Sequence, residues 1–243
     1  MARFFRSIIL VFSLLFSFCV WASGSEHHFR FHNSDIHLIW YSEFTSQEKK
    51  HLTKWVKSGL NVVRHLNGKL PRNKLRFQLQ QRESNRNSPV PYAQVLRDDM
   101  PGVHFWVDAK RTYYDLIRDW TFTHELVHLY IDYPGDKDIW LSEGLATYYQ
   151  NILLVRGGLL TERDFWRRYV EGLNRGKYDS NFDGYPLEAV SEHMRGIGMY
   201  MRVYWSGALF FLEANIALWE RDKPLLDQLL VTFLACCQSP SQY

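Results

Sequence analysis

The first half of the 243-residue chain mixes strand-like and helical patterns of apolar positions. Residues 75–80 alternate between apolar and polar side chains, as a strand with one buried face does. A helix is predicted at residues 46–65, because Thr45 and Glu48 form a capping-box pattern at its start. Further strands are predicted at residues 36–41, 92–96 and 103–107.

The second half is predicted to be mainly helical, with glycine-rich or polar turns between the helices. Thr161 suits the N-cap position of one helix, and Gly207 and Ala208 would let another pack closely against a neighbour. Residues 174–185 are predicted to be a surface loop, since their acidic spacing does not match an EF-hand. The predicted helices cover residues 139–155, 162–173, 199–220 and 224–236.

A further predicted helix carries the sequence His-Glu-x-x-His at His124, Glu125 and His128. Positions four apart on a helix differ by about 40° around the axis and about 6 Å along it, so both imidazoles leave the same face. They can therefore bind one metal ion together. The turn signal at residues 133–136 ends this helix just after His128 and allows the next helix to return beside it.

Glu143 is separated from His128 by fourteen residues and lies near the start of that returning helix. The two histidines and Glu143 make three protein ligands, which leave one tetrahedral zinc position open for water. The zinc ion lowers the pKa of that water to about 7. Glu125 can then act as the general base that takes its proton. The pattern predicts one zinc ion per chain and peptide hydrolysis. An ordinary first-turn glutamate is the alternative for Glu143, and other metals suit the same ligands.

These residues resemble the gluzincin metallopeptidases, and within them the aminopeptidase N and glycyl aminopeptidase groups. Those groups pair a His-Glu-x-x-His helix with a helix that begins Trp-Leu-x-Glu-Gly, as residues 140–144 do here. The resemblance is strong over residues 120–151. It implies an α+β fold with a thermolysin-like zincin catalytic domain, in which a small mixed β-sheet lobe precedes a mainly helical lobe. It also implies His124, His128 and Glu143 as zinc ligands, with Glu125 as base.

The same families place a tyrosine, two residues and a glycine on a later helix, where the phenol stabilises the oxyanion. Tyr204 and Gly207 match that spacing, so the resemblance makes Tyr204 a candidate catalytic residue. A core tyrosine is the alternative. His193 is a weaker candidate for the same role and is expected to face solvent.

The chain departs from the large aminopeptidases in two respects. The segment between His128 and Glu143 is shorter, which resembles the small bacterial members of the clan, and no Gly-Ala-Met-Glu-Asn stretch precedes it. Aminopeptidase and endopeptidase action therefore both stay open. In the zincin architecture an edge strand can pair with an extended peptide, and either residues 92–96 or 103–107 can be that strand.

Residues 1–22 are predicted to be a signal peptide, because Arg3 and Arg6 precede an apolar stretch at residues 8–20 and a small residue, Ala22, closes it. The mature chain, residues 23–243, is expected to be exported to the periplasm or secreted, with an uncleaved membrane anchor as the minor alternative. It is expected to form one domain, with a sheet lobe at about residues 23–110 and a helical lobe at about 111–243.

The charge of the chain bears on its possible partners, and its cysteine content bears on its possible cross-links. Removing residues 1–22 lowers the formal charge from +3 to +1. Because the sequence has no basic patch interleaved with aromatic residues, no nucleic-acid partner is expected. The remaining cysteines, Cys236 and Cys237, are neighbours. Free thiols, a strained vicinal pair and an intermolecular link stay open, whereas an ordinary internal disulfide is not expected.

The leading hypothesis is an exported zinc peptidase acting on a peptide or protein substrate. The alternative is a peptide-binding or scaffold protein on a zincin fold without turnover. The presence of all three ligands and of Glu125 favours the enzyme. The oligomeric state and the natural substrate do not follow from the sequence.

Overall fold

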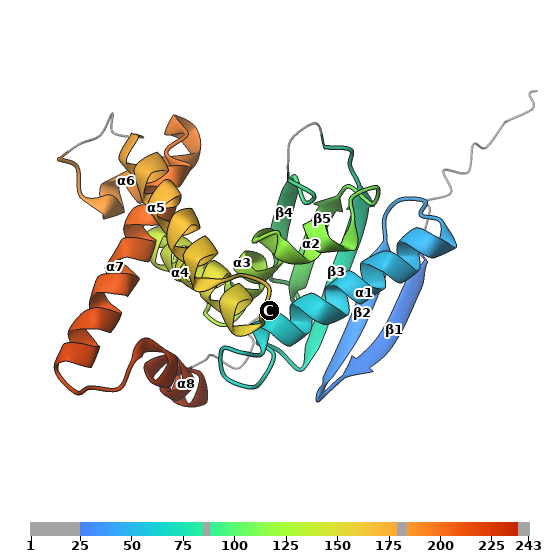
Figure 1. The fold of residues 1–243 in the computed structure, drawn as a ribbon, viewed down its shortest axis with the longest axis horizontal. Coiled ribbons are helices and arrows are strands. Elements are labelled where there is room, and N and C mark those ends of the chain that lie inside the picture. Colours follow the sequence, from blue (N-terminus) through green and yellow to red (C-terminus); the bar gives the residue numbers. More distant parts are fainter. Residues whose placement is uncertain (1–24, 85–87, 179–183, 238–243) are drawn as a thin grey trace, which may run out of the picture.

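A computed structural model describes residues 25–84, 88–178 and 184–237. The fold is of the α+β class, with a five-stranded sheet in the first half and helices in the second (Figure 1). The strands are β1 (Glu26–Phe31), β2 (Ser34–Trp40), β3 (Lys74–Gln81), β4 (Tyr92–Leu96) and β5 (Gly102–Val107). The helices are α1 (Ser46–Val63), α2 (Tyr113–Arg118), α3 (Thr121–Val127), α4 (Ile139–Arg156), α5 (Glu162–Tyr178), α6 (Leu187–Ile197), α7 (Tyr200–Glu220) and α8 (Leu226–Cys236).

The strand order in the sheet is β1-β2-β3-β5-β4. β2, β3 and β5 run parallel, while β1 and β4 pair antiparallel with their neighbours. The parallel pair β2 and β3 is joined through α1, as parallel neighbours require a crossover connection. β5 is hydrogen-bonded to a neighbour on both sides. Of the two strands that the sequence left open as the edge, β4 is therefore the one at the edge.

The main core lies between α1, α3 and one face of the sheet. Trp55 of α1 meets Phe105 of β5 and Phe122 of α3 edge to face, with ring centroids 5.2 Å apart in both pairs. Gly59 allows this approach, because a Cβ atom there would lie 2.4 Å from the Phe122 ring. The consequence is that α3 is packed against both the sheet and α1 (Figure 1).

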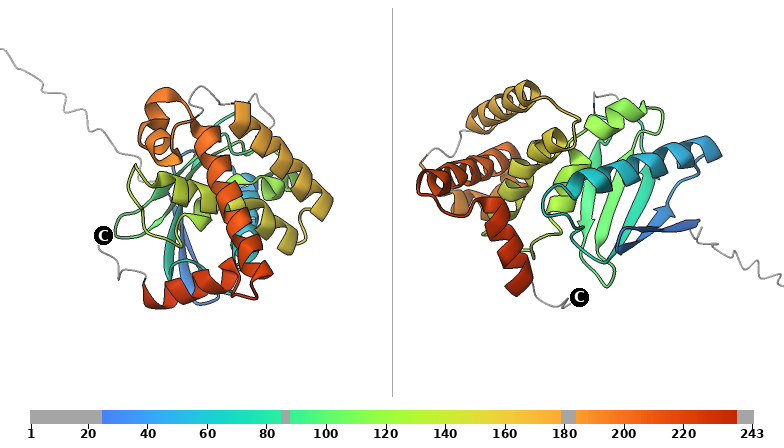
Figure 2. Two further views of the ribbon diagram at one scale, coloured as in Figure 1. Left: turned by 90° about the vertical axis from the view of Figure 1, so that its left-hand side faces the viewer. Right: turned by 60° about the horizontal axis from the view of Figure 1, so that its bottom comes forward.

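The helical half is organised around the pair α4 and α7, which lie side by side (Figures 1 and 2). Gly144 and Gly207 face each other at the crossing, where a Cβ atom on Gly207 would lie 2.7 Å from the Cα atom of Gly144. The predicted close packing at Gly207 is therefore confirmed. This contact brings Tyr204 of α7 and Glu143 of α4 into one region.

Most predicted elements are present with shifted ends. The capping box at Thr45 and Glu48 is formed, with Thr45 N–H donating to Glu48 Oε2 at 2.8 Å. The loop prediction is wrong for residues 174–178, because α5 continues to Tyr178; residues 179–183 lie outside the described part. β1, α2 and α6 were not predicted.

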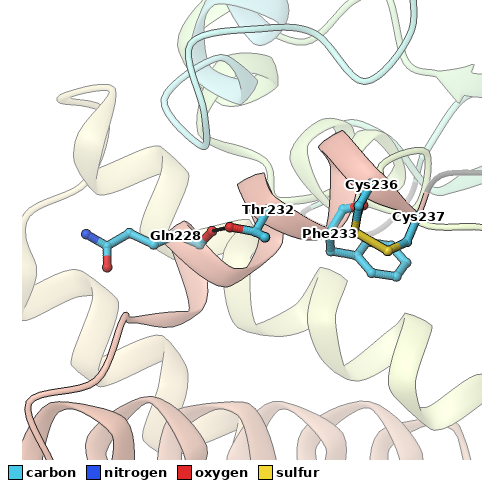
Figure 3. The surroundings of a disulfide bond; sticks show 5 residues. All are labelled: Gln228, Thr232, Phe233, Cys236 and Cys237. Atoms are coloured by element: carbon cyan, nitrogen blue, oxygen red, sulfur yellow. Dashed lines mark hydrogen bonds between the residues drawn. A yellow bond between two sulfur atoms is a disulfide. The ribbon is translucent and has the colours of Figure 1, made fainter.

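Cys236 and Cys237 at the end of α8 are joined by a disulfide (Figure 3). Their Cα atoms are 3.7 Å apart, which is below the usual range for disulfides. Of the states that the sequence left open, this structure has the vicinal pair.

The predicted signal peptide, residues 1–22, lies outside the described residues. Among the helices that the structure describes, none combines the length and the apolar character needed to cross a bilayer.

Candidate metal centre

The candidate site lies where α3 meets α4. α3 begins at Thr121 and has His128 as its C-cap residue, so both histidines fall within two turns of one short helix. Glu143 lies in the second turn of α4, next to the crossing of α4 with α7. The two histidines are almost fully buried, with relative exposures of 2% and 6%. The three residues singled out as ligands therefore come together in the interior.

Three donor atoms form a nearly equilateral triangle. His124 Nε2 and His128 Nε2 are 3.1 Å apart. Glu143 Oε2 lies 3.2 Å from His124 Nε2 and 3.3 Å from His128 Nε2. Ligand atoms held about 2.0 to 2.1 Å from a tetrahedral zinc ion are separated from one another by about 3.3 to 3.4 Å. The triangle thus has almost the size that zinc requires.

Hydrogen bonds made by the Nδ1 atoms of the two histidines explain why their Nε2 atoms face each other. His124 Nδ1 lies 2.9 Å from Gln150 Oε1, and His128 Nδ1 lies 2.8 Å from Ser142 Oγ. Because the amide oxygen of Gln150 can only accept, His124 Nδ1 donates its proton to it and the Nε2 atom faces Glu143. Two imidazole nitrogens and a carboxylate oxygen that face one another in this way can hold one cation. The group His124, His128 and Glu143 therefore fits a metal ion.

The electrostatics of the two glutamates differ. Burial alone would raise the pKa of Glu143, but the charges and hydrogen bonds of His128 and His124 outweigh it and hold that pKa well below the ordinary value. The pKa of Glu125 is raised, chiefly by burial and also by the charge of Glu143, while the two histidines oppose the rise. One glutamate is thus kept as an anion, and the other takes up a proton more readily, as a proton carrier should.

Tyr204 reaches the same place from α7. Its ring lies nearly parallel to that of His124, with centroids 5.5 Å apart. Burial, the charges of Glu143 and Glu125, and a hydrogen bond to Glu143 raise the pKa of the phenol well above its usual value. The phenol therefore keeps its proton and can donate it in a hydrogen bond. His193 is exposed on α6, as expected from the sequence.

Two side chains outside the site fix the ends of α3. Asp119 Oδ1 accepts the backbone N–H of Thr121 at 2.9 Å, before the first histidine. The Arg97 guanidinium, just after β4, donates to the carbonyl oxygens of His128 and Ile131 at 2.7 and 3.1 Å. These bonds satisfy backbone groups that the helix itself leaves without partners. They hold a helix of only seven residues in register.

A cavity of about 670 Å³ borders the site. Its wall includes Trp120, Gln150 and Tyr204, all of which contact the His124 ring. Thr147 also lines it, and among the described residues its buried hydroxyl has no hydrogen-bond partner. Three arginines and three acidic residues also line it: Arg118, Arg168, Arg175, Asp115, Asp119 and Glu171. The cavity thus offers polar groups for a bound molecule next to the candidate metal-binding group.

Sequence reasoning missed Gln150, Ser142, Arg97 and Asp119. A signal for Gln150 existed, because it follows Glu143 by seven positions and two helical turns bring it to the same face of α4. Ser142 adjoins Glu143 and offered no spacing signal. The contacts of Arg97 and Asp119 depend on how the chain folds around α3, so no local pattern marks them.

No protein-family model matches the chain, and no curated protein matches it. Among solved structures, the fold is similar to that of an aminopeptidase N family protein from Idiomarina loihiensis, with a TM-score of 0.54 and 13% sequence identity. The match covers 87% of this chain and 40% of that one, so the chain spans less than half the length of this neighbour. At this identity the similarity shows the fold.

Proposed function

We propose that this chain is an exported zinc-dependent peptidase with a thermolysin-like zincin catalytic domain of the gluzincin type. The observation that carries the proposal is the triangle of His124, His128 and Glu143 donor atoms, with edges of 3.1 to 3.3 Å in a buried setting. The fold similarity to an aminopeptidase N family protein supports the same class of chemistry.

In this proposal the three side chains hold zinc, which supplies a Lewis acid that polarises the scissile carbonyl and lowers the pKa of water. Gln150 and Ser142 hold the outer ring nitrogens and thereby keep both Nε2 atoms directed at the ion. The low pKa of Glu143 keeps this ligand ionised throughout the working pH range.

Glu125 acts as the general base and then as the general acid. It takes a proton from the attacking water as the new carbon–oxygen bond forms. It returns that proton to the leaving amine nitrogen as the carbon–nitrogen bond breaks, so the carboxylate is regenerated. Its raised pKa brings it closer to the pH at which both transfers are effective.

Tyr204 donates a hydrogen bond to the oxygen that becomes negative in the tetrahedral intermediate. A phenol whose pKa is raised stays protonated and serves as a fixed donor. Removing one donor of this kind typically lowers the turnover rate about 10²-fold to 10³-fold. The position of Tyr204 over the His124 ring supports this role.

A peptide is the proposed substrate class. β4 is an edge strand with a free side onto which an extended peptide can add hydrogen bonds. α3 contacts β4 and Arg97 ties the end of the strand to the end of α3, so a peptide bound there lies near the ligands. The 670 Å³ cavity beside Tyr204 can take a side chain or a chain end.

The test is mass-spectrometric cleavage profiling of residues 23–243 on an unbiased peptide mixture, beside the Glu125→Gln variant. We expect cuts that disappear in the variant, and their position at the amino terminus or inside the peptides separates aminopeptidase from endopeptidase action. A wild-type chain that carries zinc but makes no Glu125-dependent cut would favour the peptide-binding scaffold instead.

A further inference from the structure

A second group of metal-binding side chains lies on the opposite edge of the sheet. β1 and β2 form an antiparallel pair in which His28 is directly opposite His37. Glu26 precedes His28 by two positions and so points to the same face of the strand. The edge strand β1 is separated from β4 by the whole width of the sheet (Figure 1). The group is therefore distinct from the site on α3 and α4.

The three side chains converge. The His28 and His37 rings meet edge to face with centroids 4.0 Å apart. Glu26 Oε2 lies 2.8 Å from His28 Nε2, and one donor atom from each of the three residues lies within 4.8 Å of the other two. Two ligands of one zinc ion lie about 3.3 to 3.4 Å apart, so rotation of these side chains closes the remaining gap.

Two neighbouring histidines do not take part. His27 points to the other face of β1, where its ring lies 5.8 Å from that of Phe29. His32 lies in the turn after β1, where its Nε2 atom is 2.7 Å from the Arg64 guanidinium. The chain thus places histidines on both faces of the first strand, but only one face gathers a complete ligand group.

We propose that Glu26, His28 and His37 form a second, exposed divalent-metal site that binds Zn²⁺ and links β1 to β2. Two imidazoles and one carboxylate are ligands that zinc accepts readily. Glu26 and His28 have side-chain exposures of 48% and 53%, which leaves the remaining coordination positions to water. Such a site is open and structural, unlike the buried one.

A zinc ion bound at this site would cross-link β1 to β2 at the start of the described residues. Among the strands that the structure describes, β1 pairs with β2 alone, and edge strands open more easily than inner strands. A metal ion held by His28 and His37 adds a bond across that pair. Zinc should therefore slow the opening of β1 without requiring any change at α3.

The first test is equilibrium dialysis of the mature chain against buffered Zn²⁺, with the metal counted by mass spectrometry. We expect about two zinc ions per chain in the wild type and about one in either His28→Ala or His37→Ala. His27→Ala is the matched control and should keep both. The double variant His124→Ala with His128→Ala should keep the exposed ion alone.

The second test is amide hydrogen exchange of β1, with and without Zn²⁺. We expect zinc to slow exchange at residues 26–31 in the wild type and in His27→Ala but not in His28→Ala. Equal zinc counts in the wild type and His28→Ala, together with no zinc effect on β1, would overturn the proposal. Neither measurement uses turnover, so this result is independent of the proposed peptidase activity.

Discussion

At the scale of single residues, the candidate metal centre combines the carboxylate of Glu143 with the imidazoles of His124 and His128. Glu143 is the anion of the group, and its low pKa records the attraction of His128 and His124. His124 and His128 are oriented by Gln150 and Ser142, which are neutral partners. We therefore expect the replacement of each of these side chains to have its own effect on zinc binding.

Replacing Glu143 by alanine should weaken zinc binding more than replacing Gln150 or Ser142 would, because Glu143 is one of the three proposed ligands. We expect zinc content after dialysis to fall well below that of the wild type. Glu192→Ala, on the exposed side of α6, is the control and should bind normally. Full zinc content and full cleavage rate in Glu143→Ala would show that this residue is not a ligand.

Replacing Gln150 by alanine should lower zinc affinity by about 10-fold to 100-fold, as the loss of an outer hydrogen-bond partner does. The reason is that His124 Nδ1 loses its acceptor and the ring can turn away. Competition with a chelator of known affinity measures the change. Gln150→Glu keeps an acceptor and should restore binding; if both variants bind as the wild type does, the assigned role of Gln150 is wrong.

Tyr204→Phe should lower kcat by about 10²-fold to 10³-fold while KM and zinc content stay near wild type. The reason is that phenylalanine lacks the phenolic hydroxyl but keeps the ring that lies over His124. Steady-state kinetics on a peptide found by cleavage profiling gives both constants. Tyr200→Phe, one turn earlier and 40% exposed, is the matched control. An unchanged kcat in Tyr204→Phe would make it a packing residue.

At the scale of elements, the crossing of α4 and α7 sets the position of both Glu143 and Tyr204. Gly207→Ala should destabilise the protein by about 1 to 3 kcal/mol, because the added methyl group would meet the backbone of α4. It should also reduce zinc content. Gly196→Ala in α6 meets no atom within 4 Å and serves as the control. Chemical denaturation measures the free energy of unfolding; equal values for both variants would contradict the close packing.

The elements that the sequence predicted are those with a local signal. α1 has its capping box, and β3 has its alternation. α2 was missed because six residues are too few for a periodic pattern, although Thr112 and Asp115 form a capping box there. α6 was missed because its charged residues and Gly196 hid the helical spacing of Val190, Ser191 and Met194, which are buried.

β1 shows where local patterns fail. Its sequence, Glu26–Phe31, is largely exposed on both faces, so no alternation marks it as a strand. It forms because β2 offers a hydrogen-bonding edge. The sequence also left open whether residues 92–96 or 103–107 form the other edge, because β5 inserts between β3 and β4.

At the scale of the whole molecule, the sheet half and the helical half meet at α3. The grouping of His124, His128 and Glu143 was predictable, because the two histidines have helical spacing and Glu143 lies in the Trp-Leu-x-Glu-Gly pattern of the next helix. The outer contacts of Arg97 and Asp119 were not, because they join segments far apart in the sequence. The fold similarity to an aminopeptidase N family protein agrees with the resemblance that residues 120–151 indicate, although the sequence identity is only 13%.

The measurement that tests the central claim most directly is recovery of peptide cleavage when Zn²⁺ is titrated into metal-stripped mature chain. We expect no cleavage without metal and a rise in cleavage that saturates when the group of His124, His128 and Glu143 holds one zinc ion. Glu125→Gln should take up that zinc and stay inactive. Cleavage by the metal-free chain, or by zinc-loaded Glu125→Gln at the wild-type rate, would contradict it.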